Sequence, residues 1–178
     1  MACEKKPLAA PGRVVVTATK SGSENNWSRF GGFLSQAIAD PAADIDKDGE
    51  TSLLEAWLTA ARKTADFYKD EGRIASEHSL LDDNGDGLGT PPDWFAGVQL
   101  AKRGKEGTAP DGQRAAQIHL VHSAAERALT GEQRGQRDAL ERDLAALRGR
   151  KTAMKEDDYL VELEALLLKI ARIYRGGS

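Results

Sequence analysis

The sequence has one cysteine, three histidines and no apolar run long enough to cross a bilayer. With Cys3 alone, the chain cannot form an intramolecular disulfide or a CxxC metal site, and its redox compartment stays undecided. A membrane-spanning helix needs about 20 apolar residues, and the polar opening "MACEKK" does not match a signal peptide. We therefore expect a soluble chain as encoded with no membrane partner. The location of the protein is unknown, and we expect an extracytoplasmic location if the chain is a fragment of a longer precursor.

A strong charge of either sign is also absent. The net charge is −3 although charged residues make up 30% of the 178 residues, so the sequence predicts no nucleic-acid partner. Hydrophobic residues reach 40%, which is typical of a folded chain with one sizeable core or two small ones.

One β-branched run is typical of a buried strand. In "RVVVTATKSGS", Val14, Val15 and Val16 are followed by the turn residues Ser21 and Gly22. A lone strand leaves its backbone N–H and C=O groups without partners, and this strand is the only convincing one in the sequence. We therefore expect either that part of a sheet is missing or that another chain supplies it.

Two amphipathic helices are predicted on either side of an acidic segment. The first, in "ENNWSRFGGFLSQAIAD", has an apolar stripe and ends before Pro41. The second, in "SLLEAWLTAARKTADFYKDEG", ends at Gly72 in the manner of a helix C-terminus. The two stripes consist of Trp27, Phe30, Leu34 and Ile38, and of Leu54, Trp57, Leu58, Ala61, Ala65 and Tyr68.

Beyond a polar linker at residues 101–113, the chain is predicted to be helical. "AAQIHLVHSAAERAL" is expected to place His119 and His122 on one helix face, as surface or packing residues rather than as a zinc site. Thr130 and Gln133 have the spacing of a capping box. Two heptad stripes follow, joined by a short turn: Leu140, Leu144 and Leu147, then Tyr159, Leu163, Leu166, Ile170 and Ile173.

These stripes predict an antiparallel coiled-coil hairpin. In one interpretation the two seams bury each other. In the other, residues 132–175 form a surface for self-association or for a helical protein partner. The predicted organisation is therefore a segment with one strand at 1–24, a helix-loop-helix region at 25–100, the linker at 101–113 and the hairpin at 114–178.

The segment "DIDKDGETSLLE" spaces its acids as a cation site requires. A hard divalent cation such as Ca²⁺ takes about six to eight oxygens, which a twelve-residue loop supplies by coiling around the ion. An ordinary Asp-Gly turn explains the glycine but not the three alternate acids. The predicted ligands at positions 1, 3, 5, 7, 9 and 12 are Asp44, Asp46, Asp48, the Glu50 carbonyl, Ser52 and Glu55, and Gly49 makes the turn at position 6.

A second segment, "DDNGDGLGTPPD", repeats the pattern less completely. Its closing acid is an aspartate, whose shorter arm reaches with one oxygen rather than two, so we expect weaker Ca²⁺ binding or better tolerance of Mg²⁺. Thr90 is expected to cap a helix that accepts prolines in its first turn and continues into "DWFAGVQL". A capped turn that binds nothing is the other interpretation. The predicted ligands are Asp82, Asn84, Asp86, the Leu88 carbonyl, Thr90 and Asp93, with Gly87 at position 6.

Between Trp27 and Val98 the chain resembles the EF-hand family. The first loop matches that family's metal-binding pattern at every ligand position, and the second matches at all but the closing acid. The resemblance implies two Ca²⁺ sites that lie opposite each other as a pair. Two departures predict weak coupling and irregular geometry: position 8 is Thr51 in one loop and Gly89 in the other, and Pro41 interrupts the first entering helix.

A second resemblance concerns "VVVTATKSGS", which is similar to the last part of a caspase-like or legumain-like cysteine peptidase domain. In that family a buried strand ends at the catalytic cysteine, and the matching position here is Thr19. A threonine hydroxyl is a poor nucleophile without a positioned base, and no histidine precedes this strand. The resemblance therefore implies a pseudo-peptidase without peptidase chemistry.

Together these patterns predict a mainly α protein: an EF-hand-like helix-loop-helix pair with one N-terminal β-strand, followed by an antiparallel helical hairpin. The predicted function is non-enzymatic Ca²⁺ binding, structural or regulatory. The alternatives are a degenerate or truncated caspase-like or legumain-like peptidase domain and a coiled-coil interaction protein.

Overall fold

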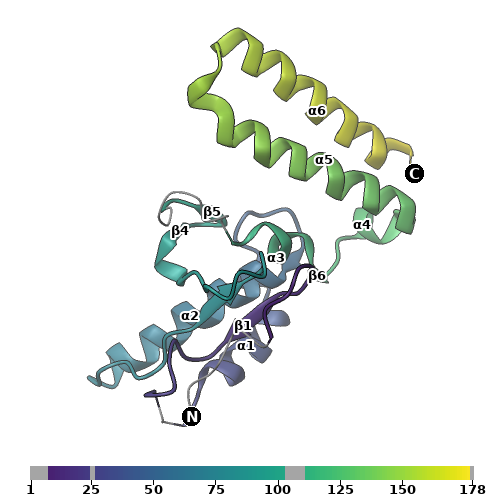
Figure 1. Ribbon diagram of the computed structural model, residues 1–178. Helices are drawn as coiled ribbons and strands as arrows, with labels where there is room; N and C mark the ends of the chain where they lie inside the picture. Colours follow the sequence, from purple (N-terminus) through teal and green to yellow (C-terminus); the bar gives the residue numbers. More distant parts are fainter. Residues whose placement is uncertain (1–7, 25–26, 103–110, 177–178) are drawn as a thin grey trace. The chain divides into compact units, whose positions relative to one another are not determined.

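The computed structural model describes residues 8–24, 27–102 and 111–176, and Cys3 lies outside them. The chain is mainly helical and divides into two compact units, residues 1–121 and 122–178 (Figure 1). None of the helices in the described ranges combines the length and apolar character needed to cross a membrane.

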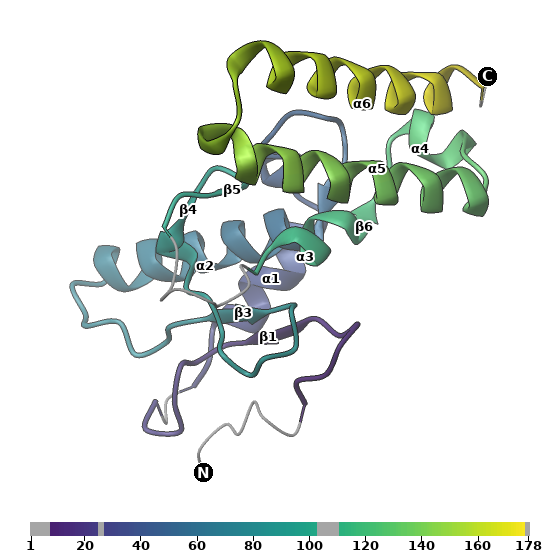
Figure 2. The same cartoon turned by 45° about the horizontal axis from the view of Figure 1, so that its top comes forward.

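The N-terminal strand has a partner within the chain. β1 (Val15–Thr17) pairs antiparallel with β3 (Leu80–Asp82), with Val16 opposite Leu81 (Figure 2). This finding corrects the expectation of a missing sheet or a second chain, because the residues that lead into the second acidic loop supply the partner. A three-residue strand that ends in an acid carries too little pattern to be recognised from its sequence.

The first helix is shorter than its apolar stripe predicted. α1 (Phe30–Ile38) begins after Trp27, whose side chain is 87% exposed and lies outside the helix. The carboxylate of Glu77 accepts hydrogen bonds from the N–H groups of Arg29 and Phe30 and so satisfies the start of the helix. The helix ends before the 3₁₀ turn η1 (Pro41–Ala43), as Pro41 predicted.

The second helix, α2 (Leu53–Asp70), has the predicted ends. Ser52 and Glu55 form a capping box at its start. At its end Gly72 has φ 61°, and its N–H donates to the Lys69 carbonyl while the Arg73 N–H donates to the Tyr68 carbonyl. α1 packs along α2, with the ring of Phe33 centred 6.3 Å from that of Phe67.

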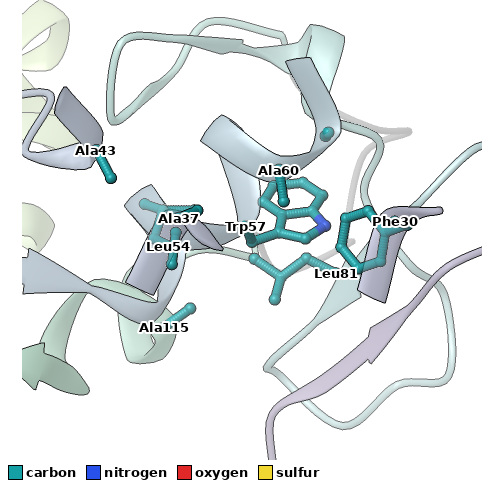
Figure 3. Packing of buried hydrophobic residues seen from close by; sticks show 10 residues of the cluster. Phe30, Ala37, Ala43, Leu54, Trp57, Ala60, Leu81 and Ala115 are labelled. Carbon is teal, nitrogen blue, oxygen red and sulfur yellow. The ribbon is translucent and has the colours of Figure 1, made fainter. Parts of the chain in front are cut away.

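The core of the first unit forms around Trp57, which is completely buried (Figure 3). Its indole N–H donates to the Ser79 hydroxyl at 2.5 Å, and its ring meets Phe95 edge-on with centroids 5.7 Å apart. Trp57 follows the first acidic loop, whereas Ser79 precedes and Phe95 follows the second. The same core therefore anchors both loops.

The chain after the second loop forms a hairpin, which corrects the predicted helix over "DWFAGVQL". The 3₁₀ turn η2 (Pro92–Trp94) leads into β4 (Phe95–Ala96), which pairs with β5 (Gln99–Leu100). Gly97, with φ 59°, makes the turn between them. A left-handed glycine in the middle of the segment favours this turn over a continuous helix.

The segment with two histidines is not one helix, which corrects a second expectation. α3 (Gln113–Gln117) is followed by β6 (His119–Val121), which pairs antiparallel with β2 (Thr51–Ser52). Pairing with the end of the first acidic loop overrides the helical pattern here. Of the predicted linker, residues 103–110 lie outside the described ranges, whereas Asp111 and Gly112 are buried.

The second unit consists of α4 (Ala124–Ala128), α5 (Gly131–Arg150), the 3₁₀ turn η3 (Lys151–Ala153) and α6 (Glu156–Gly176). The predicted capping box of Thr130 and Gln133 starts α5. α5 and α6 lie side by side (Figures 1 and 2), and contacts near both ends, from Arg137 to Tyr174 and from Arg150 to Glu162, make them antiparallel.

Candidate metal centre

The first acidic loop is held in a cup by hydrogen bonds from its own backbone. The carboxylate at position 1, Asp44, accepts the N–H of Gly49 at position 6. Asp46 accepts the N–H of Asp48, and Asp48 accepts the N–H of Glu50. Positions 4 and 6, Lys47 and Gly49, have φ of 64° and 85° and so turn the chain twice in the left-handed sense.

This cup brings three carboxylates together. One oxygen each of Asp44, Asp46 and Asp48 lies within 4.8 Å of the others. Burial and the neighbouring charge of Glu55 raise the pKa of Asp46, and burial and the charge of Asp46 raise the pKa of Asp48. Oxygen Oδ1 of Asp44 is buried and accepts no hydrogen bond from the described residues. The loop therefore concentrates negative charge that its own hydrogen bonds do not fully satisfy.

Glu55 closes the first loop from the first turn of α2. Its Oε1 accepts the N–H of Ile45 at 2.7 Å and, more weakly, that of Asp46 at 3.4 Å. Its Oε2 accepts both the N–H and the hydroxyl of Ser52, each at 2.8 Å. The carboxylate thus joins positions 2 and 3 to position 9, and each oxygen keeps lone pairs for a further partner.

The second loop has the same backbone. Asp82 at position 1 accepts the N–H of Gly87 at position 6, at 2.9 Å. Asn84 accepts the N–H of Asp86, and Asp86 accepts the N–H of Leu88. Positions 4 and 6 are Gly85 and Gly87, with φ of 84° and 77°. All three hydrogen bonds and both left-handed turns of the first loop therefore recur at the same positions.

The acid that closes the second loop comes from outside the twelve residues. Asp111, which is 4% exposed, accepts the N–H of Asp83 at 2.9 Å and that of Asn84 at 3.3 Å through Oδ1. Its Oδ2 accepts the hydroxyl of Thr90 at 2.6 Å. These are the contacts with positions 2, 3 and 9 that Glu55 makes in the first loop. Burial, with the charge of Asp83, raises the pKa of Asp111 to about 6.

Asp93, the predicted closing acid, lies on the surface. Its side chain is 67% exposed and its carboxylate pairs with Lys102 at 2.8 Å. The short 3₁₀ turn over Pro92–Trp94 replaces the helix that would carry position 12 back over the loop. In the second loop Asp111, and not the predicted closing acid Asp93, makes the contacts that Glu55 makes in the first loop.

Each loop is paired with a different strand. Position 8 of the first loop, Thr51, lies opposite Val121 of β6, whereas Thr90 of the second loop forms a bridge with Leu81. The side chain of Glu50, whose carbonyl is the predicted ligand, lies 3.1 Å from the imidazole of His119. This arrangement differs from the expected mutual pairing of the loops, because Thr51 at position 8 of the first loop pairs with Val121 and Thr90 at position 9 of the second loop pairs with Leu81.

Sequence reasoning missed Asp111 and Asp83. Asp111 lies 21 residues after Thr90 within a polar stretch, where no local spacing connects it to the loop. Asp83 accepts the N–H of Ala115 in the first turn of α3 and so ties the loop to that helix. "APDG" carries only a turn signal, so the structure was needed to find the connection.

Comparisons with known proteins find no match to this chain: no family model, no curated protein and no solved structure corresponds to it.

Proposed function

We propose that the chain binds Ca²⁺ through two EF-hand-type loops and does so without catalysis. The observation that carries the proposal is the repetition of one hydrogen-bonding scheme in two segments of different sequence. Each segment places oxygen-bearing side chains at positions 1, 3, 5 and 9 and closes with one buried acid. A capped turn that binds nothing does not require the same arrangement of side-chain oxygens in both segments.

The donor set fits a hard divalent cation. All proposed ligand atoms are oxygens, from carboxylates, one amide, hydroxyls and two backbone carbonyls, which suits Ca²⁺ or Mg²⁺ and not a thiolate-seeking metal. The unsatisfied Oδ1 of Asp44 supports the fit, because a buried carboxylate oxygen needs a donor or a cation. The raised pKa values of Asp46 and Asp48 also fit, because a bound cation stabilises the charged forms.

We assign the metal a structural role. Both loops are anchored in the core around Trp57, and the second is also tied to Asp111 and to the start of α3. Binding free energy at either loop would therefore stabilise the fold of the first unit rather than move an isolated helix. The second site has fewer charged ligands, with Asn84 at position 3, and is expected to bind Ca²⁺ more weakly or to tolerate Mg²⁺ better.

The test is calorimetric titration of Ca²⁺ into chelator-treated full-length protein. We expect two binding events for the natural sequence. Glu55→Gln is expected to remove the first and Asp82→Asn the second, because each replaces a charged ligand with a neutral group of the same shape.

Two exposed acids, Asp70 at the end of α2 and the C-cap residue Glu71, provide matched controls. Asp70→Asn and Glu71→Gln remove the same charges away from the loops and are expected to leave both binding events unchanged. Tryptophan fluorescence, to which the buried Trp57 contributes, offers a second readout on the same samples. Absence of heat and of any fluorescence change at millimolar Ca²⁺ would overturn the proposal.

A further inference from the structure

Residues 111–121, which run from Asp111 through α3 to the end of β6, contact both acidic loops, and we call them the connecting segment. At the start of the segment, the Asp111 carboxylate bonds to positions 2, 3 and 9 of the second loop. Further along, the N–H of Ala115 donates to the carboxylate of Asp83, at position 2 of the same loop, at 2.9 Å. The second loop therefore holds the connecting segment at two points.

The other end of the connecting segment is the strand partner of the first loop. β6 pairs with β2, which contains positions 8 and 9 of that loop. The carbonyl of Ile118 accepts the N–H of Leu53, the first residue of α2, at 2.7 Å. The imidazole of His119 lies 3.1 Å from the carboxylate of Glu50 at position 7. The strand that completes the first loop thus belongs to the segment that the second loop holds.

The part between these two ends is closely packed. Ala115 is completely buried in the core around Trp57. Gly112 lies so close to Phe95 that an added Cβ would be 2.8 Å from the ring, and its carbonyl accepts the N–H of Ala116 at 2.9 Å. Packed interiors rearrange as units rather than bend continuously. A displacement of Asp111 is therefore passed on to β6 rather than absorbed within α3.

We propose that the connecting segment couples the two cation sites, so that a cation in either loop raises the affinity of the other. This inference rests on the proposed binding of Ca²⁺ by both loops. A cation in the second loop attracts the Asp111 carboxylate and fixes the start of the segment, so β6 is already in place when the first loop binds. Fixing the segment costs conformational entropy, and one ordering step serves both ions. The effect is equal in both directions because coupling between binding sites is reciprocal.

Direct pairing of the two loops is not needed for this coupling. Thr51 and Gly89 at position 8 predicted weak coupling because neither is the aliphatic residue that pairs such loops. In the structure, β2 pairs with the connecting segment instead. The route from Asp111 to β6 lies entirely within the first unit.

The first experiment compares calorimetric Ca²⁺ titrations of the chelator-treated full-length chain with those of two variants that each keep one site. Glu55→Gln leaves the second site, and Asp82→Asn leaves the first. We expect each remaining site to bind at least about fivefold more weakly than the same site does in the natural protein once the other loop is filled.

An insertion tests whether the connecting segment carries the effect. Two glycines between Gln117 and Ile118 separate α3 from β6, and both sites should then bind with the affinities of the single-site variants. The same insertion after Gly97, in the exposed turn between β4 and β5, is the matched control and should preserve the coupling. Circular dichroism checks that both insertion variants keep their helices.

Amide hydrogen exchange provides a readout that needs no insertion. In Glu55→Gln, Ca²⁺ acts only through the second loop. We expect it to slow exchange at least about tenfold at the N–H of Leu53, which donates to Ile118, and in residues 118–121. The N–H groups of α1 should be slowed much less.

The outcomes separate this inference from the proposed function. Absence of binding at both loops would overturn both. Two sites that bind equally well alone and together would overturn the coupling and leave Ca²⁺ binding intact. Coupling that survives the insertion after Gln117, or exchange slowed equally in α1 and in residues 118–121, would show that the connecting segment does not carry it.

Discussion

The hydroxyl of Thr90 donates a hydrogen bond of 2.6 Å to the carboxylate of Asp111, 21 residues further along the chain. In the first loop the hydroxyl of Ser52 makes the equivalent bond to Glu55, only three residues away. One loop is therefore closed by its own exiting helix, and the other by a buried aspartate that follows an intervening hairpin. Integrity of the second loop thus depends on residues well outside the twelve that define it.

We predict that Asp111→Asn weakens cation binding in the second loop at least about tenfold and affects the first loop less, only through the connecting segment. The neutral amide keeps the size of the side chain but loses the charge and presents only one acceptor oxygen where two now bond to Asn84 and Thr90. Calorimetric titration measures the change in affinity of each loop.

Asp93→Asn is the matched control for this prediction. Because the Asp93 carboxylate is exposed and paired with Lys102, its loss should change the affinity of the second loop little. The opposite ranking, with Asp93→Asn severe and Asp111→Asn mild, would show that the closing acid is the one at position 12.

The sequence predicted those features that depend on neighbouring residues. The left-handed turn at Gly49, the helix end at Gly72 and the capping box of Thr130 and Gln133 all rest on interactions within a few residues. Features set by distant contacts were not predictable. β3 is a strand because it meets β1, and His119 lies in a strand because β2 needs a partner.

The same distinction between neighbouring and distant contacts applies to the candidate site. Spacing alone identified the two cups, since each is built from side chains that bond to the backbone two to five residues ahead. The closing acid of the second cup was assigned to Asp93 by analogy with the first. Only the three-dimensional path of the chain places Asp111 there instead.

Gly112 is predicted to be intolerant of a side chain. Its φ is 107°, and an added Cβ would lie 2.8 Å from Cε1 of Phe95, whose ring is held against Trp57. We expect Gly112→Ala to destabilise the first unit by about 2 kcal/mol or more, because backbone strain and overpacking act together. Urea unfolding followed by tryptophan fluorescence measures the loss.

Gly32→Ala provides the control for that substitution. Gly32 lies within α1, and an added Cβ there would meet nothing within 4 Å. Alanine has the higher helix propensity, so the variant should be neutral or more stable by up to about 1 kcal/mol. A Gly112→Ala protein as stable as Gly32→Ala would contradict the prediction.

Glu77 is expected to contribute a pH-dependent part of the stability. Burial raises the pKa of the Glu77 carboxyl, but hydrogen bonds to the carboxylate outweigh burial and lower this pKa below its usual value. The donors are the Arg29 N–H, the Ser28 hydroxyl, the Phe30 N–H and the Tyr68 hydroxyl. A lowered folded-state pKa means that the stabilisation is complete above about pH 4.5 and is lost as the pH falls through the folded-state value.

Glu77→Gln should remove this dependence. At neutral pH the variant is expected to be less stable by about 2 kcal/mol, because charged hydrogen bonds at the start of α1 are replaced by neutral ones. Between about pH 5 and pH 3 its stability should fall less steeply than that of the natural protein. Parallel pH profiles of equal slope would contradict the assignment of Glu77 as the responsible carboxyl.

The second unit depends on a buried ion pair that joins its helices. Glu126 of α4 and Arg137 of α5 are 1% and 3% exposed, and Oε2 of Glu126 accepts a hydrogen bond of 2.7 Å from Nη1 of Arg137. Arg137 also donates to the Tyr174 hydroxyl of α6 and to Asp138. Burial lowers the pKa of Arg137, but these hydrogen bonds outweigh burial and raise it above the usual value. Without Glu126, Arg137 keeps only the more exposed Asp138 and Glu141 as ion-pair partners, and without Arg137, Glu126 keeps Arg134 at 3.5 Å.

We therefore predict that Glu126→Gln destabilises the second unit by about 1 to 3 kcal/mol, because one buried charged hydrogen bond is lost; the measurement is loss of helical circular dichroism on heating. Glu162→Gln removes the same charge from the pair with Arg150, where both side chains are more than half exposed, and should change the melting temperature little. Replacing both buried charges in Glu126→Leu with Arg137→Met should recover stability relative to Glu126→Gln, because neither buried position then holds a charge that must be desolvated. Equal melting temperatures for Glu126→Gln and Glu162→Gln would show that the buried pair does not hold the three helices together.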